Sequence, residues 1–233
     1  MTIRERYKQV LALLAQERPF VQTELLYKDA FSLLVAVMLS AQCTDKRVNM
    51  VTPNLLKAFP DAKAMAQASV EEILSYISSV SYPNSKANHL QQMARLLVDR
   101  FSGEVPSSRE ELMLLPGVGR KTANVMLAVF FNQPAMPVDT HVFRVSERIG
   151  LTRGASTVEE TERTLVKHIP LGELADVHHR LILHGRYVCL ARKPKCSECV
   201  LSSCCRYYAL ANKGVSNLGR KQQREENLVN RKK

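Results

Sequence analysis

Residues 115–122 read Leu115-Pro116-Gly117-Val118-Gly119-Arg120-Lys121-Thr122, and this stretch decides how the rest of the chain is interpreted. It joins a helix expected to begin near Ser107 to an apolar helix expected to end near Phe131. Two glycines one residue apart allow a tight turn and let a phosphate approach the backbone closely. The first amides of the second helix then point outward at the positive end of its dipole. The stretch predicts a phosphate-binding hairpin, although an ordinary turn between helices could also carry two glycines.

Helical periodicity extends over most of the chain, whereas the alternating pattern of strands is not sustained anywhere, so the fold class is predicted to be all-α. The first helix ends before Pro19, and Phe31 to Ser40 reads as a helix buried on all sides. Three pairs match the capping-box pattern at a helix start: Ser69 with Glu72, Ser107 with Glu110, and Thr157 with Glu160. Further helices are expected near residues 45–58, 84–101, 120–131, 140–150 and 173–184.

The charge of the chain is strongly positive, with 33 Lys and Arg against 22 Asp and Glu and a net charge of +11. Residues 213–233 contribute +5 of this charge, so the body of the protein is basic as well. Such a surface attracts polyanions. The N-terminus lacks the apolar segment of a signal peptide, and the longest apolar run is too short to span a bilayer. We therefore expect a cytoplasmic protein without a membrane partner.

Four cysteines form a C-x6-C-x2-C-x5-C pattern within seventeen residues, at Cys189, Cys196, Cys199 and Cys205. This spacing suits a cubane iron–sulfur cluster better than the paired CxxC arms of most zinc ribbons. Cys204 lies beside Cys205, so the fourth ligand could be shifted by one residue, although the spacing favours Cys205. His178, His179 and His184 precede the pattern and are interpreted as structural residues or phosphate contacts.

Lys121 and Asp139 are candidate catalytic residues because the chain can bring them together. Lys121 stands at the start of the second hairpin helix, which carries the chain roughly 15 Å away. The segment from Asn132 to Val138 contains two prolines and could reach back by about 23 Å. Asp139 precedes another expected helix, so it can act as an N-cap and hold its carboxylate in place. The competing interpretations are a solvated lysine and a purely structural cap.

Six motifs in order resemble the endonuclease III family of helix-hairpin-helix DNA glycosylases. These motifs are LSAQCTD at 39–45, NSKA at 84–87, LPGVGRKTANV at 115–125, VDTHVFRV at 138–145, LILHGRYVC at 181–189, and the four-cysteine pattern. The resemblance implies a six-helix barrel domain at 22–132 and an iron–sulfur cluster domain formed by 1–21 and 133–212, with the active cleft between them. A flexible basic tail at 213–233 is expected to follow.

The resemblance also implies a function and its residues. The family is bifunctional: it removes oxidised pyrimidines from double-stranded DNA and then cleaves the strand at the abasic site, as a monomer. Lys121 matches the nucleophile, Asp139 the catalytic carboxylate, and Gln42 the residue that fills the gap left by the flipped nucleotide. The remaining matches are the phosphate-binding Gly117, Val118, Gly119 and Arg120, and the 4Fe–4S ligands Cys189, Cys196, Cys199 and Cys205.

Several residues are singled out with a weaker basis. Ser81-Tyr82-Pro83 departs from the family, in which a glycine and an aliphatic wedge are more usual. Tyr82 could replace the wedge by stacking on the base opposite the lesion, or it could pack as an ordinary loop tyrosine. His141 is expected to line the active cleft, and Lys193 and Lys195 to meet the DNA backbone from the cluster loop.

Two alternative functions stay open at this point. One is a monofunctional mismatch glycosylase, against which Lys121 and the short chain argue. The other is a non-catalytic iron–sulfur protein that binds DNA for signalling. Trapping of a covalent intermediate with borohydride separates both from the bifunctional enzyme.

Overall fold

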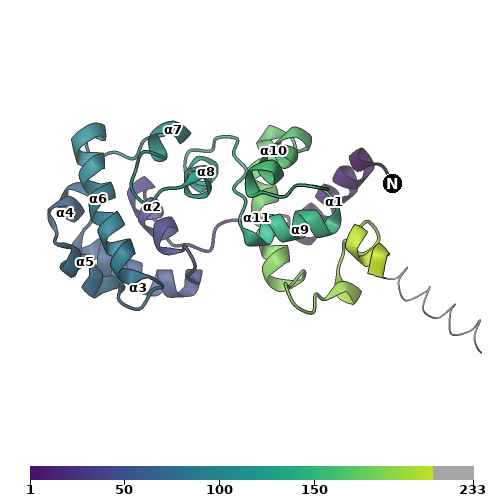
Figure 1. The fold of residues 1–233 in the computed structure, drawn as a ribbon, viewed down its shortest axis with the longest axis horizontal. Helices are drawn as coiled ribbons and strands as arrows, with labels where there is room; N and C mark the ends of the chain where they lie inside the picture. Colours follow the sequence, from purple (N-terminus) through teal and green to yellow (C-terminus); the bar gives the residue numbers. More distant parts are fainter. Residues whose placement is uncertain (212–233) are drawn as a thin grey trace, which may run out of the picture. The chain divides into compact units, whose positions relative to one another are not determined.

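The computed structural model describes residues 1–211, in which all regular structure is helical (Figure 1). The described residues divide into two compact units. Unit 1 comprises Met1–Val21, Val138–Ile169 and the chain from Asp176 onward, whereas unit 2 comprises Gln22–Pro137 and Pro170–Ala175. The basic tail expected at 213–233 lies outside the described residues. No helix of the described chain is both long enough and apolar enough to cross a membrane.

Unit 2 contains seven of the α-helices in the described chain. They are α2 (Ala30–Leu39), α3 (Asp45–Ala58), α4 (Ala62–Gln67), α5 (Val70–Ile77), α6 (Pro83–Phe101), α7 (Arg109–Leu112) and α8 (Arg120–Val129). Helix α2 contacts α3, α6 and α8, and every residue from Phe31 to Leu39 is buried, as the sequence predicts. One apolar core extends through the unit from Leu25 to Ala135. Burial of this surface stabilises the unit at roughly 25 cal/mol per Å².

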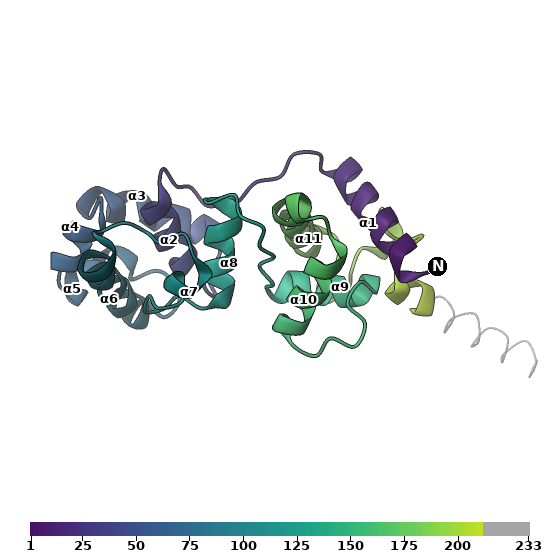
Figure 2. The same cartoon turned by 90° about the horizontal axis from the view of Figure 1, so that it is seen from above.

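Unit 1 combines helices that precede the unit 2 segment in the sequence with helices that follow it (Figure 2). They are α1 (Ile3–Glu17), α9 (Thr140–Ile149), α10 (Val158–His168) and most of α11 (Leu174–Tyr187), followed by the short 3-10 helix η2 (Cys196–Glu198). A further 3-10 turn, η1 (Leu171–Glu173), precedes α11. Helix α1 is held by Arg6, which is buried and whose Nη1 donates to the carbonyls of Ile149 and Cys204. The first helix of the chain thus packs on its last described segment.

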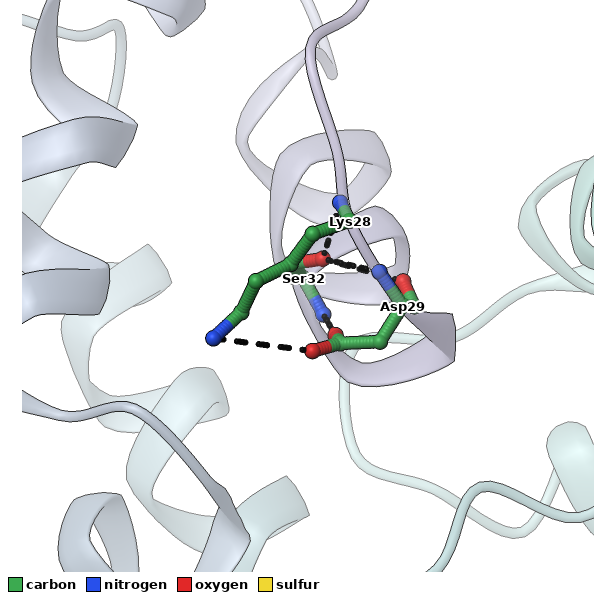
Figure 3. A network of polar contacts seen from close by, with 3 residues as sticks. All are labelled: Lys28, Asp29 and Ser32. Carbon is green, nitrogen blue, oxygen red and sulfur yellow. Dashed lines mark hydrogen bonds and ion pairs between the residues drawn. The ribbon is translucent and has the colours of Figure 1, made fainter.

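The start of α2 shows how polar side chains set a helix boundary (Figure 3). Asp29 Oδ1 accepts from the Ser32 amide at 2.7 Å, and Ser32 Oγ accepts from the Asp29 amide at 3.0 Å. Ser32 Oγ also accepts from the Lys28 amide at 3.0 Å, while Lys28 Nζ lies 3.7 Å from Asp29 Oδ2. This reciprocal cap satisfies amides that the helix itself leaves unpaired. The apolar α2 therefore begins at a fixed residue.

Two of the three capping boxes expected from the sequence are confirmed, at Ser69 with Glu72 and Thr157 with Glu160. The third is wrong by one residue, because Ser108, not Ser107, accepts from the amide of Glu111. Both serines match the sequence pattern, because Glu110 and Glu111 each follow one of them by three residues. Helix α7 itself is only four residues long. The helices expected at 120–131 and 140–150 end earlier, at Val129 and Ile149, and the helix expected at 173–184 spans Leu174–Tyr187.

Candidate functional site

The hairpin predicted from residues 115–122 lies between α7 and α8. Gly117 has a φ of +79°, a left-handed conformation that a side chain resists, and the Val118 amide donates to the Leu115 carbonyl at 3.0 Å. Gly119 is the N-cap of α8 and has no side chain to cap the first amides of the helix. A Cβ placed on Gly119 meets nothing within 4 Å. The amide end of α8 is therefore open to an anion, and Lys121 is exposed in its first turn.

Gly117 is fixed by the helices behind the hairpin. A Cβ at this position would lie 2.9 Å from His89 Cβ and 3.0 Å from Met38 Cε, so α6 and α2 pack directly on the glycine backbone. The same residues line a pocket of about 220 Å³ together with Ala41, Gln42, Tyr82, Ser85 and Lys86. The hairpin and the loops that carry Gln42 and Tyr82 therefore meet at one pocket within unit 2. Both Gln42 and Tyr82 are exposed at its rim.

Asp139 is the N-cap of α9, as the sequence predicts. Its Oδ1 accepts from the amides of His141 at 2.9 Å and Val142 at 2.8 Å, so the carboxylate position is set by the helix. His141 packs against α11, since a Cβ on Gly185 would lie 2.8 Å from His141 Cβ. Lys121 belongs to unit 2 and Asp139 to unit 1, and their pairing remains a prediction from the sequence.

All four cysteines of the predicted cluster line a single pocket in unit 1. The pocket is bounded by Cys189, Cys196, Cys199 and Cys205, and by residues that include Arg148, His184, Leu201, Tyr207 and Tyr208. Cys204 does not line this pocket: its side chain is buried and its Sγ donates to the Leu201 carbonyl at 3.4 Å. The geometry therefore places Cys205, and not its neighbour, on the same pocket as the other three cysteines.

Two side chains face the cysteine sulfurs: Arg148, for which the sequence predicted no role, and His184, which was interpreted from the sequence as a structural residue or a phosphate contact. Arg148 Nη1 lies 3.6 Å from Cys189 Sγ and donates to the Leu190 carbonyl at 2.7 Å. His184 Nε2 lies 3.5 Å from Cys199 Sγ, while its Nδ1 is 3.7 Å from Glu17 Oε2. Burial lowers the pKa of His184, and the Glu17 carboxylate opposes that shift. These residues supply hydrogen-bond partners to the thiols, the kind of contact that tunes a sulfur ligand wherever a metal is bound.

The donor set of the pocket suits an iron–sulfur cluster by its chemistry, because four thiols line one space. Among the described residues no set of three His, Cys, Asp or Glu side chains meets closely enough to hold one ion. A four-iron cubane takes one thiolate at each iron, so its ligands surround a space, as these four cysteines do. Burial raises the pKa of Cys199 to about 11 and raises that of Cys205. Because thiolates are the ligating form, occupation of the pocket releases protons.

The predicted DNA contacts of the cluster loop lie on the surface. Lys193 and Lys195 are exposed, and Lys193 has a left-handed φ of 50°. The Lys195 amide donates to the Val188 carbonyl at 3.0 Å, which closes the loop between the first two cysteines. Arg144 adds a second tie, since its Nη2 donates to the carbonyls of Gly185 at 2.9 Å and Cys189 at 3.2 Å. The loop therefore presents its lysines from an anchored backbone.

Comparison with known proteins identifies what this arrangement resembles. Residues 35–171 match the HhH-GPD superfamily of base excision DNA repair proteins. The chain is 45% identical over 199 residues to endonuclease III of Rickettsia felis, covering 85% of this chain and 93% of that protein. It is 45% identical over 188 residues to endonuclease III of Bacillus subtilis, covering 81% and 86%.

Solved structures agree with the sequence comparison. A trapped endonuclease III–DNA covalent intermediate superimposes with a TM-score of 0.87 at 43% identity, covering 91% of this chain and 99% of that chain. A non-covalent endonuclease III–DNA complex gives the same TM-score at 42% identity, covering 91% and 100%. A thermostable thymine-DNA glycosylase shares the fold at 23% identity, with a TM-score of 0.76 and coverage of 89% and 97%.

Proposed function

The chain belongs to the endonuclease III family of HhH-GPD base excision repair proteins, and we propose that Lys121 and Asp139 make it a bifunctional glycosylase and lyase for oxidised pyrimidines in double-stranded DNA. The observation that carries the assignment is the exposed Lys121 in the first turn of α8, directly after the open amide end of the hairpin. A phosphate held by those amides brings the neighbouring sugar near the lysine amine. We expect the protein to act in the cytoplasm, as a monomer.

The proposed chemistry uses the amine as a covalent electron sink. The damaged nucleotide leaves the base stack, at a cost of a few kcal/mol, and exposes C1′ of its sugar. Lys121 Nζ attacks C1′, the N-glycosidic bond breaks, and the base departs with a proton. Ring opening gives an iminium between Nζ and C1′, which acidifies C2′. Loss of a C2′ proton then forms the C2′–C3′ double bond and expels the 3′ phosphate with the electrons of the C3′–O bond, and hydrolysis of the imine frees the lysine.

Asp139 is proposed to stabilise the cationic sugar and to assist proton transfer. Its role as N-cap makes a clean test possible, because asparagine also caps helices well. Asp139→Asn keeps an oxygen for the amides of His141 and Val142 while removing the charge. We expect base release to fall by roughly 10²- to 10⁴-fold with α9 intact. An unchanged rate would reduce Asp139 to a cap.

Borohydride trapping tests the role of Lys121. The native protein should form a covalent adduct with duplex DNA that contains an abasic site, and Lys121→Gln should form none. Lys57→Gln, which alters an exposed lysine on α3, is the matched control and should trap normally. Equal trapping by Lys121→Gln would overturn the assignment. Base release without any adduct would favour a monofunctional glycosylase. The absence of both base release and adduct would favour a non-catalytic DNA-binding protein.

A 4Fe–4S cluster is proposed to occupy the cysteine pocket, held by Cys189, Cys196, Cys199 and Cys205. The adjacent pair Cys204 and Cys205 provides an internal control. Cys205→Ala should abolish the visible absorbance of the cluster and its bound iron and sulfide. Cys204→Ala should retain both, because that thiol lies outside the pocket. The reverse result would shift the fourth ligand by one residue.

Further interactions with DNA are proposed on both units. In unit 2 the hairpin backbone at Gly117, Val118, Gly119 and Arg120 binds phosphate, while Gln42 fills the gap in the duplex and Tyr82 stacks beside it. In unit 1 His141 faces the DNA, and Lys193 and Lys195 meet the backbone. Alanine at either lysine should lower the salt dependence of binding by about 0.9 in log–log slope for each phosphate that the protein no longer neutralises. The cluster absorbance should not change.

A further inference from the structure

Two loops of unit 2 carry unusual backbone conformations. Gln42, after α2, has a φ of 53°, and Tyr82, before α6, has a φ of 54°. Neither residue is glycine, and such left-handed conformations are strained and persist only where the surroundings enforce them. The side chains of both residues project from the surface, and Tyr82 is 65% exposed. Something other than side-chain packing must therefore hold the two loops.

Side-chain donors bind the carbonyls of the first loop. Ser81 Oγ donates to the Gln42 carbonyl at 2.7 Å, across 39 residues of sequence. Lys86 Nζ donates to the Leu39 carbonyl at 2.8 Å and to the Ala41 carbonyl at 2.7 Å. Three carbonyls within four residues are thus bound by donors next to and within α6. These bonds tie the loop of Gln42 to the loop of Tyr82.

Lys86 is unusual for a lysine because it is only 8% exposed. Burial lowers the pKa of its amine, and the nearby Cys43 opposes the shift. A buried ammonium is costly unless its donors are satisfied, and the two carbonyl acceptors provide that compensation. The side chain lines the same pocket as Gln42, Tyr82 and the hairpin glycine Gly117. Lys86 is therefore a fixed part of the surface that the proposed function assigns to DNA.

We propose that Ser81 and Lys86 are positioning residues that hold Gln42 and Tyr82 as one preformed wedge for entry into the duplex at the lesion. The inference rests on the proposed function and adds to it the residues that set the geometry of the wedge. Ordering the two loops before DNA arrives removes an entropy cost that binding would otherwise include. The departure at Ser81 then has a physical role, since a glycine has no hydroxyl to donate.

The test compares duplex with single-stranded DNA. Entry of the wedge matters only where a base must be unstacked, whereas attack by Lys121 on an abasic site in a single strand needs no wedge. Ser81→Ala should slow single-turnover base release from a duplex by about 3- to 10-fold, as expected for one net hydrogen bond. Its borohydride trapping on single-stranded abasic DNA should equal that of the native protein. Ser81→Thr, which keeps a hydroxyl, should restore the duplex rate.

Ser75→Ala is the matched control, because the Ser75 hydroxyl also donates over 2.7 Å, but to Glu72 within its own helix. This variant should behave as the native protein on both substrates. Lys86→Met should slow base release from a duplex more than Ser81→Ala does. If Lys86→Met does not fold, the result for Ser81→Ala alone tests the inference. A native duplex rate in Ser81→Ala overturns the inference, as does an equal loss on both substrates. Absence of trapping by the native protein would instead refute the proposed function.

Discussion

The interiors of the two units differ in kind. Unit 2 is built around one apolar core, and its only buried charged side chain among the described residues is Lys86. Within the part of unit 1 that the structure describes, five charged or histidine side chains are buried, which are Arg6, Glu162, His178, Arg180 and His184. Its arginines donate to backbone carbonyls, as Arg180 Nε does to Arg18 at 3.0 Å. Both units bury apolar side chains, such as Leu14 and Val145 in unit 1, but unit 1 adds a polar framework of buried charged and histidine side chains and a cysteine pocket.

This difference predicts that the stability of unit 1 depends on the proposed cluster and that the stability of unit 2 does not. Removal of a cluster ligand should have the largest effect of the substitutions considered. Cys199→Ala removes one proposed ligand and should destabilise unit 1 by more than about 5 kcal/mol, which is the upper end for single core substitutions. Hydrogen exchange on the full chain should show lost protection in α9 and α10, with α2 and α6 still protected. Native protection of the unit 1 amides without bound iron would show that unit 1 does not depend on the cluster for its stability.

A core substitution should produce the next largest effect, and in the other unit. Leu34 is fully buried at the centre of α2, so Leu34→Ala should lower the unfolding free energy of unit 2 by about 2–5 kcal/mol. Leu26→Ala, at a side chain that is 63% exposed, should change it by less than about 0.5 kcal/mol. Exchange rates of the α2 amides measure both. Equal effects would mean that apolar packing is not what distinguishes unit 2.

Arg6 tests the polar framework of unit 1. Arg6→Met keeps much of the apolar stem but leaves the carbonyls of Ile149 and Cys204 without this donor. We expect the stability of unit 1 to fall by about 1–3 kcal/mol, measured by exchange in α1 and α9. Arg4→Met, on the exposed side of the same helix, is the control. If Arg6→Met instead stabilises unit 1, apolar packing at this position contributes more stability than the hydrogen bonds of the arginine.

The smallest effect is expected at the helix caps, where the two units are alike. Hydrogen bonds with Ser69 lower the pKa of Glu72, and those with Ser156 and Thr157 lower that of Glu160. A carboxylate with a lowered folded pKa adds stability above its ordinary value of 4.5, and this stability is lost as pH falls through the lowered pKa. Glu72→Gln and Glu160→Gln should therefore each be slightly destabilising at pH 7 and neutral at strongly acid pH. If the two substitutions lower stability by different amounts, the units also differ in how their surface caps contribute to stability.

Much of the fold could be predicted from the sequence because its signals are local. Apolar periodicity located α2, and caps such as Thr157 with Glu160 fixed helix starts. Helix α4 was not predicted, because a helix of six residues is too short for a helical repeat of apolar residues to be recognised. The hairpin, the Asp139 cap and the four-cysteine pocket follow from short motifs, each legible within a few residues.

The residues that support the site could not be found in the same way. A lysine in a helix is ordinarily exposed, so nothing local marks Lys86 as buried. The bond from Ser81 to Gln42 spans 39 residues, and the approach of His184 to Cys199 depends on how a loop folds back on a helix. These interactions exist only in three dimensions. Sequence motifs indicated the candidate site residues, and tertiary structure revealed the side chains that hold their surroundings in place.

The bond between Arg6 and Cys204 has a consequence for the order of synthesis. The two residues are 198 positions apart, so the ribosome releases α1 long before its partner carbonyl exists. At about 5–20 residues per second the interval is roughly 10–40 s. All of unit 2 is made within that time, because its last residue is Ala175. The first helix to emerge therefore gains its last partner carbonyl only after the whole of unit 2 has been made.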